Sequence, residues 1–158
     1  MSAVLGVDVS SHNVDLVKLD EDTNHAQWHR IPLTGPTAFD RLRTLQMPTA
    51  SYFDDVYIAG IETPKTRFMA SAAALLPVYG AAIHAMPAAL QVWPVHPKTW
   101  RSTLGLKGNA TKAEVAAQVL ELAPAIAHEW PQDALDAYAV ALYVRTINQQ
   151  AIDQEKLP

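Results

Sequence analysis

The stretch Ala3–Val9, AVLGVDV, decides the fold. It is a short run of small and β-branched apolar residues, which is typical of a strand buried on both faces. Residues 10–13 (SSHN) supply turn-forming side chains, so residues 14–19 (VDLVKL) are predicted to return as a second strand. A polar turn at 20–24 then leads to a third predicted strand at 26–33. The chain therefore opens with a predicted antiparallel meander.

The rest of the sequence alternates helices and strands. Residues 56–61 (VYIAGI) and 89–93 (ALQVW) are further apolar runs of strand length. Helices are predicted at 37–45, 66–85, 98–104, 111–122 and 133–148. Three antiparallel strands followed by strands joined through helices predict a five-stranded mixed sheet flanked by helices. Gly80 marks a point where its helix could approach the sheet closely, and the length of 158 residues fits one domain over 1–158.

Composition excludes several classes of protein. Hydrophobic residues make up 49% and charged residues 18% of the chain, which is ordinary for a globular protein and argues against disorder. There is no cysteine, so disulfides, thiolate nucleophiles and cysteine zinc sites are excluded. The start of the chain lacks the pattern of a signal peptide, and the apolar stretch at 69–89 is interrupted by Pro77, His84 and Pro87. We therefore expect a cytoplasmic protein with no membrane partner.

The charges are unevenly distributed, although the net charge is only −4. Eight acids precede Val56, whereas residues 63–113 contain no acid. The same segment carries the bases Lys65, Arg67, Lys98, Arg101, Lys107 and Lys112. A segment of this kind can face a polyanion. The alternative is a chance gap in a modestly charged chain.

Four acids lie in apolar surroundings. Asp8 is near the end of the first strand, and Glu62 directly follows the strand at 56–61. Asp133 and Asp136 are spaced i, i+3, so both carboxylates project from one face of the last helix. Taken singly, the strand acids could be turn or cap residues, and the helix acids could be placed by the helix dipole.

A shared metal site would explain all four acids if the fold brings them together. When the first and fourth strands are adjacent and parallel, Asp8 and Glu62 end on the same edge, and the closing helix brings Asp136 there, with Asp133 beside it. Converging carboxylates repel one another unless cations neutralise them. Oxygen ligands without cysteine or a paired-histidine motif select Mg²⁺ or Mn²⁺. Two such ions about 4 Å apart can hold the attacking and leaving oxygens of a phosphodiester, which predicts a nuclease site.

In this order the motifs resemble the RuvC-type Holliday junction resolvases of the RNase H-like nuclease superfamily. VLGVDVSS contains Asp8, VYIAGIE ends in Glu62, and DALDAYAVAL contains Asp133 and Asp136. The resemblance spans residues 5–144, and its specificity comes from several short motifs in the correct order.

Two basic positions extend the resemblance. GNATKAEVAAQV, residues 108–119, is similar to the family's glycine-then-lysine segment, with Lys112 on its basic position. Lys98, in VHPKTWR, is similar to a basic residue that follows the fifth strand in the family. The spacing between these two lysines is longer than is usual in the family.

The resemblance implies an RNase H-like fold, two Mg²⁺ ions that Mn²⁺ can replace, a homodimer, and paired nicks across a four-way DNA junction. The four acids would bind the metal, with Asp8 as the bridging ligand. Lys112 would act as a catalytic residue that stabilises the charge of the scissile phosphate, and Lys98 would contact the DNA backbone. The further candidates for phosphate contacts are Lys65, Arg67, Arg101 and Lys107.

One segment departs from the family pattern. After Glu62 the sequence reads TPKTRFMAS, and the aromatic residue that bacterial members insert into the junction is not at its expected place. Phe68 is the candidate substitute. The departure suits a phage-encoded or otherwise divergent member whose substrates extend to other branched DNA.

Three other functions remain as alternatives. A nuclease of the same fold could act on RNA or on RNA–DNA hybrids, and a catalytically silent module could bind nucleic acid. An actin-like ATP-binding domain has a similar strand order, but GVDVSSHN lacks the paired glycine and hydroxyl phosphate loop expected there.

Overall fold

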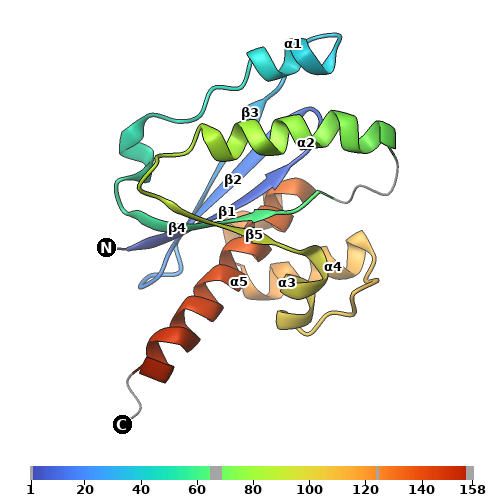
Figure 1. Ribbon diagram of the computed structural model, residues 1–158. Helices are drawn as coiled ribbons and strands as arrows, with labels where there is room; N and C mark the ends of the chain where they lie inside the picture. The colour runs from blue at the N-terminus through green and yellow to red at the C-terminus, as the bar shows by residue number, and fades with distance from the viewer. Residues whose placement is uncertain (1, 65–68, 124, 156–158) are drawn as a thin grey trace.

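The computed structural model describes residues 2–64, 69–123 and 125–155. Its five-stranded sheet has the strand order β3-β2-β1-β4-β5 (Figure 1). The strands are β1 (Ala3–Val9), β2 (Asn13–Asp20), β3 (Ala26–Pro32), β4 (Val56–Glu62) and β5 (Gln91–Val95). The helices are α1 (Ala38–Arg43), α2 (Met69–His84), α3 (Pro97–Thr103), α4 (Lys112–Leu122) and α5 (Gln132–Glu155), with 3₁₀ turns at Ala50–Phe53 and Ala125–Glu129.

The pairing of the strands confirms the predicted mixed sheet. β1 pairs with β2, and β2 with β3, in antiparallel register. β4 lies parallel to β1 on its other side, and β5 lies parallel to β4. The observed β5 begins two residues later than predicted, and α5 continues past the predicted end at residue 148. Thr111 and Glu114 form the capping box that begins α4, in which each side chain accepts from the other residue's backbone N–H.

Helices cover both faces of the sheet (Figure 1). α2 packs on one face, where its Val78 and Ala82 join a core that includes Leu5 and Val7 of β1. α5 packs on the other face, together with α3 and α4, against a core that includes Val4. Because side chains alternate along a strand, Val4, Gly6 and Asp8 share the face covered by α5. The central strand therefore delivers its only acid to that face.

Two glycines allow α5 to lie directly on the sheet. A Cβ added at Gly6 would overlap the carbonyl oxygen of Ala137 and lie 2.5 Å from the backbone nitrogen of Ala141. A Cβ added at Gly60 would lie 2.8 Å from a methyl carbon of Val140. The expectation that Gly80 marks a close approach to the sheet was wrong, because Gly80 lies on the exposed side of α2 with open space around its Cα.

None of the helices in the described ranges combines the length and the apolar character that crossing a membrane requires.

Candidate active site

A row of charged side chains crosses three strands at one end of the sheet. Asp8 of β1 lies directly opposite Asp15 of β2, and Asp15 lies directly opposite Arg30 of β3. Opposite residues in an antiparallel ladder point to the same face, so all three side chains lie on the face covered by α5. Asp15 is buried, with 1% of its surface exposed, and accepts hydrogen bonds from Trp28 and Arg30.

Glu62 joins this row from the parallel side of β1. Val7 pairs with Ile61, so the next residues along the two strands, Asp8 and Glu62, end on the same edge of the sheet. The indole Nε1 of Trp100, a fully buried residue of α3, donates a hydrogen bond of 2.6 Å to Glu62 Oε2. Glu62 is thereby oriented from the helix layer beneath the sheet.

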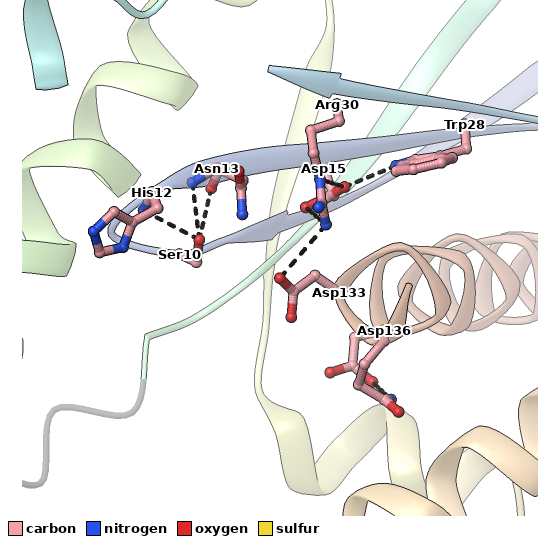
Figure 2. A network of polar contacts seen from close by, with 9 residues as sticks. Ser10, His12, Asn13, Asp15, Trp28, Arg30, Asp133 and Asp136 are labelled. Atoms are coloured by element: carbon pink, nitrogen blue, oxygen red, sulfur yellow. Dashed lines mark hydrogen bonds and ion pairs between the residues drawn. The ribbon is translucent and has the colours of Figure 1, made fainter. Parts of the chain in front are cut away.

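The first turns of α5 bring the remaining two acids. Asp133 Oδ2 lies 3.6 Å from an amino nitrogen of Arg30, across the gap between α5 and the sheet (Figure 2). Asp136 Oδ1 accepts a hydrogen bond of 2.9 Å from the side-chain amide of Gln132, one turn earlier in the helix. The charges of both acids act on Asp8, so both lie at the end of the sheet where Asp8 and Glu62 also end.

Asp8 is the least compensated acid of the group. Burial raises the pKa of Asp8 well above its ordinary value, and the charges of Glu62, Asp136, Asp133 and Asp15 raise it further. Within the described residues no side chain donates a hydrogen bond to Asp8. Its half-buried carboxylate thus has no side-chain donor among the described residues and lies in the field of four other carboxylates.

Asp136 has a similar but milder environment. Burial raises the pKa of Asp136, whereas the hydrogen bond from Gln132 and the charges of Lys112 and Arg101 lower it in part. Lys112 begins α4, and Arg101 in α3 lies with its guanidinium carbon 5.2 Å from the ring centre of Trp100. Lys112 and Arg101 are therefore the bases that act on Asp136, at the α3–α4 side of the acid cluster.

The four acids lie at the same end of the sheet, but they are too far apart to form a compact set of metal ligands among the described residues. Across residues 2–64, 69–123 and 125–155, no three acid or histidine side chains are grouped tightly enough to hold a metal as they stand. Glu62, Asp133 and Asp136 each have a cationic or hydrogen-bonding partner of their own in this arrangement. Mutual repulsion of the carboxylates also keeps them apart.

The other basic candidates lie farther along the α3–α4 side. The side chain of Lys98 is exposed and runs past Gly108. Lys107 is exposed, and its charge contributes to lowering the pKa of Glu114. Three candidates of the sequence analysis, Lys65, Arg67 and Phe68, lie outside the described residues.

Sequence reasoning missed the residues that hold Glu62, Asp133 and Asp136, and it missed the buried acid Asp15. Asp15 has a recognisable signal, since it is the one acid between the buried valine and leucine of VDLVKL. Arg30 could be found only through its register with Asp15. The roles of Trp100 and Gln132 depend on tertiary contacts and side-chain direction, for which the sequence carries no separate pattern.

The comparisons with known proteins agree with this architecture. No protein-family model matches the chain, and no curated protein sequence is significantly similar to it. A solved structure of T. thermophilus RuvC in complex with a Holliday junction substrate is similar over 96% of this chain and 97% of that chain, with a TM-score of 0.73 and 21% identity. The chain has the RNase H-like fold.

Two further solved structures share the fold. A Thermus thermophilus RuvC structure matches over 94% of this chain and 96% of that chain, with a TM-score of 0.59 and 20% identity. A fowlpox virus Holliday junction resolvase matches over 94% and 99%, with a TM-score of 0.50 and 10% identity. The RNase H-like fold found here thus occurs in resolvases of a bacterium and of a virus.

Proposed function

We propose that this chain is a metal-dependent endonuclease that nicks branched DNA such as four-way junctions. The observation that carries the proposal is the meeting of Asp8, Glu62, Asp133 and Asp136 at one end of an RNase H-like sheet, with Asp8 uncompensated. We include in the proposal a single nuclease domain over residues 1–158, a homodimer and a cytoplasmic location.

The residues present fit divalent cations of the hard type. The donor set consists of carboxylate oxygens, which suit Mg²⁺ and Mn²⁺ better than zinc. Burial and the neighbouring acids raise the pKa of Asp8, and a bound cation would favour its charged form, which supports the proposal. In the proposed site Asp8, Glu62, Asp133 and Asp136 hold two Mg²⁺ ions, and Mn²⁺ can replace them.

Bound divalent cations at this site would lower the pKa of the attacking water and neutralise charge on the leaving oxygen. The protein's own part is to hold the acids and the DNA in place. Trp100 fixes one oxygen of Glu62 through its indole N–H. Lys112 and Arg101, which already act on Asp136, can offset the charge of a phosphate held beside that acid.

The α3–α4 side is the proposed DNA surface nearest the acids. It presents Lys98, Arg101, Lys107 and Lys112, and phosphate contacts of this kind fix the position of DNA without reading its sequence. Lys65, Arg67 and Phe68 follow Glu62 closely in the sequence, and we include them as proposed DNA contacts on that ground. Affinity for DNA is then expected to fall steeply as salt is raised.

Cleavage of a labelled four-way junction in Mg²⁺ tests the proposal. Linear duplex, RNA–DNA hybrid and structured RNA serve as competing substrates, and Asp8→Asn is compared with Asp54→Asn, which removes an exposed acid far from the site. We expect symmetric nicks in the junction from the wild type and from Asp54→Asn, and none from Asp8→Asn. Junction binding in Ca²⁺ should persist in all three proteins.

The other outcomes would replace the proposal in specific ways. Cutting of hybrid or RNA, but not of the junction, would keep the site and change the substrate. Binding without cleavage of any substrate in Mg²⁺ or Mn²⁺ would identify a nucleic-acid-binding module. Equal cleavage by wild type and Asp8→Asn would remove Asp8 from the metal site.

A further inference from the structure

Arg30 lies among the acids of the proposed metal site, although it comes from the far strand of the meander. Its guanidinium donates to both oxygens of Asp15, at 2.9 Å from Nε and 3.1 Å from an amino nitrogen. The same arginine lies 3.6 Å from Asp133 Oδ2 (Figure 2). The hydrogen bonds that Arg30 donates to Asp15, together with the charges of Asp15, Asp133 and Asp8, raise the pKa of Arg30.

The two contacts of Arg30 differ in strength. Asp15 is buried and also accepts a 2.7 Å hydrogen bond from the indole Nε1 of Trp28, whose ring lies 5.4 Å from the guanidinium carbon of Arg30. Bidentate, partly buried pairs of this kind are strong and fix the geometry of the arginine. The contact with Asp133 is longer, and both side chains are about one third exposed. It is therefore the contact that can open.

We propose that Arg30 is a resident counter-cation of the acid cluster, which Asp15 holds in place and which competes with a divalent cation for Asp133. The inference rests on the proposed metal site. Asp133 leaves Arg30 when it becomes a metal ligand, whereas Asp15 and Arg30 stay paired. Arg30 is thus a positioning residue that sets the metal affinity. Its pairing with Asp15 limits how strongly Arg30 competes with the cation for Asp133.

The charges of the cluster support this division. Five acids gather at this end of the sheet, and the tight pair of Asp15 with Arg30 is neutral as a unit. The four acids that remain carry the charge that two divalent cations would balance. Because the guanidinium of Arg30 also contacts Asp133, one of these four acids already has a cationic partner before the metal binds.

Single substitutions are expected to change the affinity in opposite directions. Arg30→Gln removes the competitor, so Mn²⁺ should bind about fivefold more tightly. Asp15→Asn leaves the charge of Arg30 uncompensated and free to favour Asp133, so Mn²⁺ should bind about tenfold more weakly. If the pair served only to hold the fold together, both substitutions would weaken binding.

The double variant Asp15→Asn/Arg30→Gln separates competition from simple charge. It removes one charge of each sign and leaves the site's net charge unchanged, and the new amides can still hydrogen-bond to each other. Because Asp133 is then free, we expect Mn²⁺ to bind about two- to fivefold more tightly than in the wild type. A charge effect alone would return the wild-type affinity.

The experiment is a Mn²⁺ titration of the DNA-free proteins, read from the electron paramagnetic resonance signal of free Mn²⁺, with thermal melts to confirm folding. Asp54→Asn/Arg43→Gln, which removes the same two charges from exposed positions away from the site, is the matched control and should bind as the wild type does. Tighter binding by the double variant supports the inference.

Wild-type or weaker affinity in the double variant overturns the inference, because Arg30 would then act by charge alone or would hold Asp133 ready for the metal. This failure differs from failure of the proposed function, in which the wild type neither binds Mn²⁺ nor cleaves the junction and both proposals fall. Junction cleavage by the wild type with an unchanged double variant removes only the role of Arg30.

Discussion

The two faces of the sheet use their buried side chains differently. The face covered by α2 is lined by apolar residues of every strand from β1 to β5, and its buried members include no charged side chain among the described residues. The face covered by α5 is apolar beneath most of the helix but ends in the acids around Asp8. The α2 face therefore serves stability, whereas the α5 face combines packing with a cluster of acids that repel one another.

The same contrast occurs within the charged end itself. Asp8 and Asp15 lie directly opposite each other on neighbouring strands, yet Asp15 has three donated hydrogen bonds and Asp8 has none from the described side chains. A buried acid with donors is a stable structural element, and one without them costs stability unless a cation binds. This difference distinguishes a scaffold acid from a candidate ligand.

The largest expected effect is the loss of cleavage in Asp8→Asn. Replacing the acid by an amide removes a carboxylate that would hold the metal, and we expect junction cleavage in Mg²⁺ to fall about 10³-fold or more. Initial rates on a labelled junction measure this. Asp15→Asn is the sharpest comparison, because it removes the opposite acid of the same ladder and should retain far more activity. An equal loss of cleavage in Asp8→Asn and Asp15→Asn would show that the two acids do not have different roles.

On the α2 face, a cavity should lower stability without changing the chemistry. Leu16→Ala empties a fully buried position on that face and is expected to cost about 2–5 kcal/mol of unfolding free energy. Denaturant melts measure the loss, and cleavage is assayed at a temperature where the variant is folded. Its cleavage rate should stay within about twofold of the wild type. A much larger fall in rate would show that the two faces are coupled.

Much of the fold could be predicted because it depends on local patterns. The apolar runs AVLGVDV and VYIAGI and the turn residues between strands indicated the meander and the parallel strand, and Thr111 with Glu114 indicated the start of α4. The sequence predicted a close helix–sheet contact at Gly80 of α2, whereas the close contact in the structure is made by α5. It depends on Gly6 and Gly60, which lie beneath α5 only once the strands are in register.

The four acids could be predicted, but the way in which they are held could not. Asp8 and Glu62 follow from strand ends, and Asp133 with Asp136 from helical spacing. Their donors come from a different strand, a different helix and a preceding helical turn. Such partners are fixed by side-chain direction in the folded chain, which no periodic pattern records.

A smaller effect is expected from the donor to Glu62. Trp100→Phe keeps most of the buried ring but removes the indole N–H that donates to Glu62 Oε2. Removing a partner that orients a ligand typically costs 10- to 100-fold, and we expect about tenfold in the Mg²⁺ concentration for half-maximal cleavage. Trp93→Phe, which alters a partly buried tryptophan packed on the same core, is the control. A similar shift in both variants would indicate loss of packing rather than loss of orientation.

The smallest expected effect concerns the stability that Asp8 costs before metal binds. Because the pKa of Asp8 is raised in the folded protein, the unfolded chain loses its proton first as the pH rises. Folding stability therefore falls from about pH 4, the ordinary carboxyl value, until the raised pKa has been passed, and the cost is constant above it. Asp8→Asn does not ionise, so in EDTA it should be the more stable protein at pH 8, by about 1 kcal/mol.

Melting both proteins in EDTA from pH 4 to pH 8 measures this difference, since groups common to both cancel. The advantage of Asp8→Asn should grow with pH, and added Mg²⁺ at pH 8 should reduce it by stabilising only the wild type. Asp15→Asn should show the opposite sign, because it deprives Arg30 and Trp28 of a buried acceptor. If Asp8→Asn were the less stable protein at pH 8 in EDTA, Asp8 would be a compensated scaffold acid like Asp15. The proposed difference between Asp8 and Asp15 would then be wrong.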